Sequence, residues 1–116
     1  MEIQFEKYQG AGNDFIMLNN LNGDYDNLTD AQIEQLCDRK FGIGADGLIK
    51  INAHEYFDYE VDYYNSDASK SFCGNGGRCA AAFARSINAP NQQHVFLGFD
   101  GPHQYSFQED QVKISM

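Results

Sequence analysis

The chain has 116 residues, of which 42% are hydrophobic and 14% aromatic, so it can form one domain with a packed core and is not a disordered chain. Its 17 acidic and 8 basic residues give a net charge of −9, and so acidic a chain is repelled by phosphate groups, which excludes nucleic acid as an expected partner. Its apolar runs are too short to cross a bilayer and it has no basic amphipathic helix, so no membrane partner is expected.

Two strands separated by a glycine-rich turn are predicted at the start of the chain. Apolar and polar residues alternate over residues 3–6, which favours an opening strand, and the apolar run at residues 15–18 predicts a buried one. Residues 10–14 supply the turn between them. Further on, Thr29 is expected to begin a helix, because Gln32 three residues later completes a capping-box pattern.

A second glycine-rich loop, residues 41–47, precedes a predicted strand over residues 48–51. The clearest periodicity follows at residues 57–63, where aromatic residues and valine alternate with acidic ones, as in a half-buried strand. We expect the apolar side chains to face the core. The acidic side chains, which begin with Asp58, are expected to form a solvated outer face, because carboxylates alternating along a flat strand make a poor metal site.

A buried helix is predicted in the second half of the chain. Residues 77–87 are rich in alanine, the best helix former, and are small and apolar on nearly every side, so we expect this helix to be surrounded by protein. Asn88 can end it, and Pro90 cannot continue it. Three further strands are predicted at residues 94–99, 103–107 and 111–116, with turns at residues 100–101 and 109–110.

The order of these elements favours an α+β fold. A curved mixed or antiparallel sheet, barrel-like and wrapped around the central alanine-rich helix, buries the apolar faces best. Residues 1–116 are expected to form a single domain. Because the chain stops directly after a strand-like run, we also expect it to be part of something longer.

Cys73 is the first candidate for chemistry. The glycine-rich residues 74–77 leave backbone N–H groups uncovered at the start of a helix, and Arg78 adds positive charge, an environment that favours the thiolate form of a cysteine. The alternative is a buried structural cysteine. Cys37 and Cys79 lie on or within packed helices, so they are expected to be structural.

Neither a metal nor a cofactor is expected. Cys73 and Cys79 are six residues apart, which is not the spacing of a redox pair or a zinc site. His54, His94 and His103 have no ligand-spaced partners and are expected in turns or at the surface. The odd number of cysteines does not suggest a secreted disulfide framework, so the cytoplasm is the expected compartment.

The two glycine-rich loops do not fit a nucleotide site. Residues 10–13 and 42–44 each precede a strand, whereas a dinucleotide pyrophosphate needs a glycine turn that opens a helix. They are either tight turns that need positive φ, or loops that let a polar group such as Asn13 approach a small ligand.

Four segments together resemble the N-terminal half of a diaminopimelate epimerase. In the order of that family, they are Lys7–Phe15, Phe41–Gly47, Asn65–Ser69 and Cys73–Cys79. The Cys-Gly-Asn-Gly block after Asn-x-Asp is the most specific of them. The chain departs from the family pattern at Gln9, where histidine is usual, and at Ala68, where glycine is usual.

The resemblance implies an enzyme without cofactor or metal that interconverts LL- and meso-diaminopimelate, on the route to lysine and bacterial cell wall. In that family two cysteines on opposite faces of the substrate's α-carbon exchange its proton, and Cys73 matches one of them. By the same correspondence, the residues that contact the amino-acid substrate are Asn13, Asn65, Gly74 and Asn75.

This sequence has no second Cys-Gly block. The resemblance therefore implies that its C-terminal domain, with the second catalytic cysteine, is a missing partner, and that the chain alone does not epimerise. Three other interpretations stay open. The chain could belong to another racemase or isomerase of the same fold, such as a proline racemase or a phenazine-biosynthesis isomerase. It could instead be a non-catalytic binding domain that self-associates as a homo-oligomer, or a redox or metal module built on Cys73 and Cys79.

Overall fold

The computed structural model describes residues 2–108 and 111–115. Within these residues the chain forms strands and helices in the order β1 (Glu6–Gly10), β2 (Asn13–Asn20), α1 (Asp30–Cys37), β3 (Gly47–Asn52), β4 (Glu60–Asn65), α2 (Gly74–Ser86), β5 (Val95–Gly98), β6 (Gly101–Gln108) and β7 (Gln111–Ile114). The turn predicted at residues 109–110, and Met116 at the end of the last predicted strand, lie outside the described residues.

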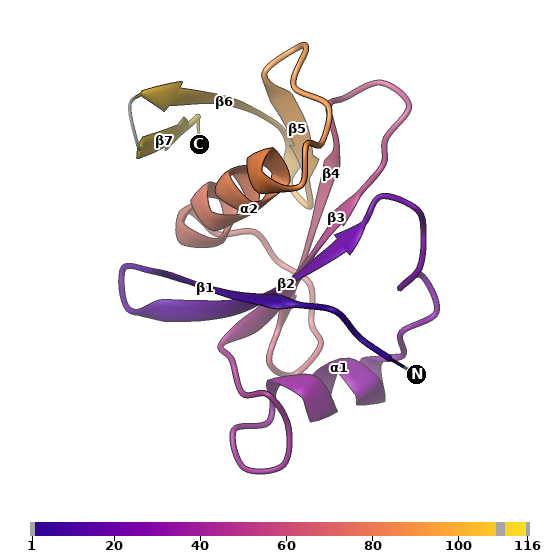
Figure 1. Cartoon of the computed structure of the whole chain (residues 1–116). Helices are drawn as coiled ribbons and strands as arrows, with labels where there is room; N and C mark the ends of the chain where they lie inside the picture. The colour runs from indigo at the N-terminus through magenta and orange to yellow at the C-terminus, as the bar shows by residue number, and fades with distance from the viewer. Residues whose placement is uncertain (1, 109–110, 116) are drawn as a thin grey trace.

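The strands form one curved, mixed sheet in sequence order from β1 to β7 (Figure 1). β2 and β3 are parallel and are joined through α1, and β4 and β5 are parallel and are joined through α2. The other neighbours are antiparallel. This follows from chain geometry, because parallel neighbours need a long crossover whereas antiparallel ones need only a short turn.

Helix α2 lies in the hollow of the sheet, with β1 and β2 on one side and β6 and β7 on another (Figure 1). Its alanines Ala80, Ala81 and Ala84 are buried against the sheet in one large apolar cluster. Small side chains let the helix axis approach the strands closely, so the alanine-rich composition determines where this helix can fit. The predicted α+β fold with a curved, mixed sheet is confirmed.

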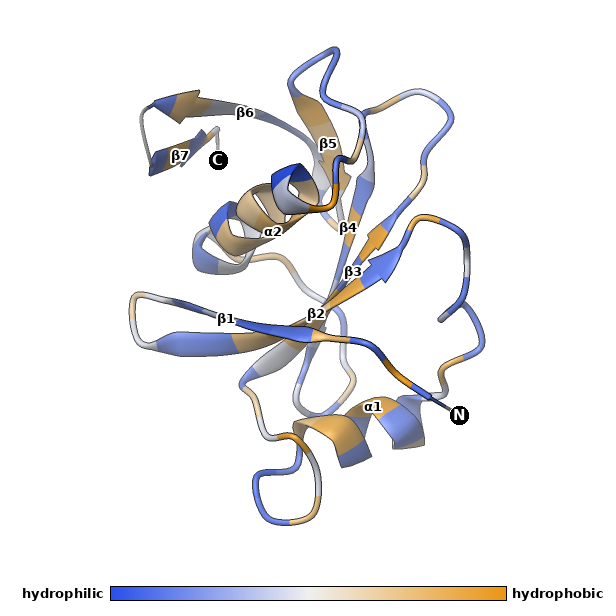
Figure 2. Cartoon of the chain, in the orientation of Figure 1, coloured by the Kyte–Doolittle hydropathy of each residue, from blue (hydrophilic) through white to orange (hydrophobic). Residues whose placement is uncertain are grey.

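Helix α1 covers the opposite face of the sheet. Ile33 and Cys37 pack against Ile16 and Leu18 of β2 in a second apolar cluster. The alternate residues of β2, Phe15 and Met17, belong to the cluster around α2. Both faces of β2 are therefore covered, which explains its continuous apolar run. Figure 2 shows hydrophobic residues along β3 and β5 and, mixed with hydrophilic ones, on both helices.

The predicted capping box at the start of α1 is confirmed. Thr29 Oγ1 accepts a hydrogen bond from the amide of Gln32 at 3.1 Å, and Gln32 Oε1 accepts one from the amide of Thr29 at 2.9 Å. These two bonds satisfy donors that a helix start otherwise leaves unpaired.

The opening strand begins at Glu6, so the predicted position over residues 3–6 was wrong. The turn between β1 and β2 consists only of Ala11 and Gly12, with φ of 52° and 86°. Two consecutive residues with positive φ are typical of a tight hairpin turn whose twist matches that of its strands. This turn pairs Gly10 with Asn13 and so sets the register of the whole hairpin.

Strand β4 was expected at residues 57–63 and lies at residues 60–65. The expected inward face is confirmed for Tyr59, Val61 and Tyr63, which are buried in the cluster around α2.

The prediction that Asp58 belongs to a solvated acidic face was wrong. Asp58 is buried, and its carboxylate accepts hydrogen bonds from the amides of residues 92–94 at 2.9–3.0 Å and from the Tyr105 hydroxyl at 2.7 Å. A carboxylate loses water on burial and needs this many donors in its place. The hydrogen bonds of Asp58 therefore hold the loop before β5 against the sheet.

The surface position expected for His103 was also wrong. Its side chain is buried in β6, its ring stacks on Phe72 at a centroid distance of 4.2 Å, and its two ring nitrogens meet Asp100 Oδ1 and the Ser115 carbonyl oxygen, each at 2.6 Å. His54 and His94 lie in loops, as expected.

Candidate functional site

Cys73 is the N-cap of helix α2. Its backbone is extended, with φ −138° and ψ 150°, and its Sγ accepts a hydrogen bond from the amide of Gly76 at 3.2 Å. Its carbonyl oxygen accepts the first helical bond, from the amide of Gly77 at 2.9 Å. The thiol thus occupies the place that a serine or aspartate side chain usually takes, over the free amides of the first turn. This is the position that the sequence predicted.

The loop before Cys73 is organised by Asn65 at the end of β4. The Asn65 side-chain amide donates to the hydroxyls of Ser69 at 3.0 Å and Ser71 at 3.2 Å. The amide of Ser71 donates to the carbonyl of Tyr63, so the loop returns along β4 towards the start of α2. Ala68 lies in this loop with φ 68°, a conformation that favours glycine.

Asn13 and Asn75 meet although they are far apart in the sequence. Asn75 Nδ2 donates to Asn13 Oδ1 at 3.3 Å, and Asn13 Nδ2 donates to Asp46 Oδ2 at 3.2 Å. Arg78 in turn donates to Asn75 Oδ1. These bonds hold the first turn of α2 against both glycine-rich loops and determine which way each amide points.

A cluster of charges holds the two glycine-rich loops together. Asp14 pairs with Arg39 at 2.8 Å and with Lys7 at 3.0 Å, and Arg39 also reaches Asp46 at 3.0 Å. Hydrogen bonds from Arg39, followed by those from Lys7, hold the pKa of Asp14 well below its usual range, although burial acts in the opposite direction. The cluster therefore keeps Asp46, the acceptor for Asn13, in place.

The predicted site residues thus gather in two groups. Cys73, Gly74, Asn75 and Asn13 lie together at the start of α2. The hydrogen bonds of the Asn65 side chain join it instead to its own loop.

Tyr63 is a site residue that the sequence reasoning missed. Its ring carbon Cε2 and the Cys73 Sγ flank the same face of Gly76, where an added Cβ would lie 2.9 Å from the first and 3.2 Å from the second. Burial first, and then the proximity of Cys73, raises the pKa of the Tyr63 hydroxyl. The one feature of the sequence that could have indicated Tyr63 is its residue type, because a tyrosine on an inward strand face needs a hydrogen-bond partner for its hydroxyl.

The other two cysteines are buried and free. Burial raises the pKa of Cys37 to about 11, and burial also raises the pKa of Cys79. Cys37 is the last residue of α1. Both thiols are therefore less available as thiolates at neutral pH.

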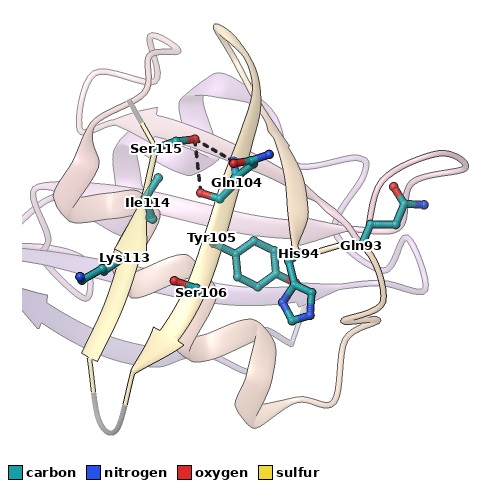
Figure 3. A pocket seen from close by; sticks show the side chains of 8 residues that line it. All are labelled: Gln93, His94, Gln104, Tyr105, Ser106, Lys113, Ile114 and Ser115. Carbon is teal, nitrogen blue, oxygen red and sulfur yellow. Dashed lines mark hydrogen bonds between the residues drawn. The ribbon is translucent and has the colours of Figure 1, made fainter.

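A concavity of about 360 Å³ lies over the β6–β7 hairpin (Figure 3). Its lining includes His94, Tyr105 and Lys113, and none of the predicted site residues. Over residues 2–108 and 111–115 there is no group of three or more histidine, cysteine or acidic side chains that could hold a metal ion. In the same part of the chain no helix has the length and apolarity needed to cross a membrane.

Solved structures share this fold. A phenazine biosynthesis protein of the PhzF family from Enterococcus faecalis has a TM-score of 0.65 at 13% identity, covering 87% of this chain and 36% of that chain. The Bacillus anthracis protein of the same family has a TM-score of 0.60 at 17% identity, covering 95% and 37%. The chain therefore shares its fold with a part of these proteins that makes up 36–37% of their length.

Sequence comparison then gives the family. The family model for diaminopimelate epimerase matches residues 5–114. The diaminopimelate epimerase of Flavobacterium psychrophilum is 46% identical over 111 residues, which are 95% of this chain and 43% of the relative, and that of Chlorobaculum tepidum is 42% identical over 112 residues, covering 92% and 43%. The chain belongs to the diaminopimelate epimerase family and corresponds to an N-terminal half, since it spans less than half the length of these relatives.

Proposed function

We propose that this chain supplies one half of the active site of a diaminopimelate epimerase, with Cys73 as one of two acid/base residues that invert the α-carbon. The observation that carries the proposal is the position of the Cys73 thiol at the N-cap of α2, where it accepts a hydrogen bond from the amide of Gly76 beside the other first-turn amides, those of Gly74 and Asn75. Membership of the family supports diaminopimelate as the substrate.

The geometry suits removal of a proton next to a carboxylate. That step builds negative charge on a group that is already anionic, and a helix start stabilises such charge with its uncovered amides and its dipole. A thiol titrates near the operating pH, so it can accept the proton in one direction and return it in the other. The first turn of α2 thus holds the acid/base thiol and stabilises the developing charge.

The amides around this turn are proposed to bind the amino-acid group of the substrate. Asn13 and Asn75 are already oriented by their mutual bond and by Asp46 and Arg78, so little ordering is needed when substrate binds. Asn65 and Gly74 complete the set: Asn65 borders the loop that leads to Cys73, and Gly74 opens the helix.

Residues 1–116 are proposed to be the N-terminal domain of a two-domain enzyme of the cytoplasm. Cys37 and Cys79 are buried and cannot face Cys73 across a substrate, so the opposing thiol has to come from another domain. The chain alone is therefore expected not to epimerise.

The proposal is tested with a chimaera in which residues 1–116 are joined to the remaining part of the F. psychrophilum relative. With LL-diaminopimelate in deuterated water, we expect the chimaera to exchange the α-proton and to form the meso isomer, and the isolated chain to do neither. Cys73→Ala in the chimaera should lower turnover by about a thousandfold, because an essential proton carrier is lost.

Cys37→Ala is the matched control, since it removes a buried thiol on the other face of the sheet and should leave turnover near the parent level. Three results would contradict the proposal: rapid turnover by the isolated chain, parent-level turnover after Cys73→Ala, and exchange of proline in place of diaminopimelate.

A further inference from the structure

Tyr63 reaches the catalytic turn from the neighbouring strand. Its side chain is only 7% exposed, and its ring packs edge-on against Phe15 at a centroid distance of 5.7 Å. The ring is also held between two glycines. An added Cβ at Gly47 would lie 3.1 Å from the Tyr63 hydroxyl oxygen, and one at Gly76 would lie 2.9 Å from its Cε2.

The hydroxyl of the neighbouring Tyr64 has a different hydrogen-bond partner. Its hydroxyl donates to Asp62 at 2.9 Å, and its side chain belongs to the apolar cluster on the opposite face of the sheet. The Tyr63 ring lies on the other face, in the apolar cluster against which Cys73 packs. The ring edge and the Cys73 Sγ both border Gly76, which offers the thiol as a hydrogen-bond partner for the phenol. A buried phenol needs such a partner, because an unpaired hydroxyl loses its hydrogen bonds to water without replacement.

We propose that the Tyr63 hydroxyl donates a hydrogen bond to the Cys73 thiolate, and that Gly47 and Gly76 leave the space for it to do so. Tyr63 is then a positioning residue that acts through Cys73. Its raised pKa keeps the phenol protonated, and hence a donor, at neutral pH. The other titratable groups that act on this phenol are Asp46 and Cys37, and both act in the same direction as Cys73.

A donor to the thiolate would have two consequences. It would increase the thiolate fraction of Cys73 near neutral pH, and it would fix the thiol in one direction above the helix start. The inference rests on the proposed function for the acid/base role of Cys73. Its test measures the reactivity of the thiol directly and needs no epimerase activity.

The test measures alkylation of Cys73 by iodoacetamide in the 116-residue chain, followed by mass spectrometry, with Cys37 and Cys79 as internal slow thiols. Tyr63→Phe should slow alkylation of Cys73 about fivefold at about pH 7, since a hydrogen bond of about 1 kcal/mol to the thiolate is lost. At about pH 10.5, well above the reference pKa of about 8.5 for cysteine, the rates should converge. A role limited to packing would change both rates by the same factor.

Tyr64→Phe is the matched control and should leave both Cys73 rates unchanged. A rate for Tyr63→Phe at neutral pH that equals or exceeds the parent rate would overturn the proposal. A second measurement does not depend on the variant's stability: in the parent chain labelled with ¹³C at tyrosine Cζ, the Tyr63 resonance should move as Cys73 titrates, and this movement should vanish after Cys73→Ser. A Tyr63 resonance that is indifferent to Cys73 would equally refute the inference.

Discussion

At the scale of single residues, Ala11 carries backbone strain in the turn that sets the β1–β2 register. It is exposed and its φ is 52°, a region in which a Cβ meets the following carbonyl oxygen. The left-handed conformation costs about 1–2 kcal/mol, whereas glycine costs about 0.5–1 kcal/mol in lost chain entropy. Relief of strain is the larger effect.

Ala11→Gly is therefore expected to raise the free energy of unfolding by about 0.5 kcal/mol in urea titrations. Ala31→Gly, the same exchange at an exposed position in α1, should lower it by about 0.5–1 kcal/mol because no strain is relieved there. Equal losses at the two positions would show that the Ala11 turn is not strained.

At the scale of elements, the end of α1 depends on the loop that follows it. The amide of Gly42 donates to the carbonyl of Asp38 at 2.9 Å, and the amide of Gly44 donates to that of Leu36 at 3.0 Å. These bonds satisfy carbonyl groups that the last turn of a helix leaves free. The loop therefore has to lie directly on the helix end, and a Cβ at Gly42 would fall 1.9 Å from the Gln35 carbonyl oxygen.

Gly42→Ala is expected to destabilise the chain by about 2 kcal/mol or more, because backbone atoms have to separate to admit the methyl group. The neighbouring Phe41 is 73% exposed, so Phe41→Ala should change stability by no more than about 0.5 kcal/mol. Thermal unfolding followed by circular dichroism checks both, and a neutral Gly42→Ala would mean that the loop can lift from α1 at little cost.

At the scale of the whole molecule, Asp58 links the segment before β4 to the segments that form β5 and β6. It precedes β4, yet it bonds to the loop before β5 and to Tyr105 on β6. Burial acts to raise its pKa, but the hydrogen bonds from backbone amides and Tyr105 outweigh burial and hold the pKa of Asp58 below the ordinary 3.8. A carboxyl with a depressed folded-state pKa stabilises the fold above its unfolded pKa, and this contribution is lost as the pH falls through the folded value.

Stability should accordingly decline as the pH falls below about 4. Asp58→Asn should cost about 2–3 kcal/mol at neutral pH, because an amide cannot accept all of these bonds, and it should flatten the acid limb of the stability curve. Glu55→Gln, which changes an exposed acid nearby, should do neither. Urea midpoints between about pH 3 and pH 7 measure the effect, and an unchanged acid limb in Asp58→Asn would refute the assignment.

The sequence by itself determined the features that arise from neighbouring residues. The Thr29 cap, the buried alanine-rich helix, the position of Cys73 at its start and the membership of the family all rest on short motifs and local periodicity. Local patterns predict these features because helix caps and tight turns are made within a few residues of the chain.

Only the tertiary structure decided which distant groups meet. Asn13 and Asn75 are 62 residues apart, and Asp58 and Tyr105 are 47 apart, so no local pattern shows that they bond. An acidic residue on an alternating strand has the same pattern whether its carboxylate faces water or a set of backbone amides, so the pattern alone predicts a surface position for Asp58. Tyr63 is the same case: alternation predicted that it faces inward, but only the approach of α2, allowed by Gly76, brings it to Cys73.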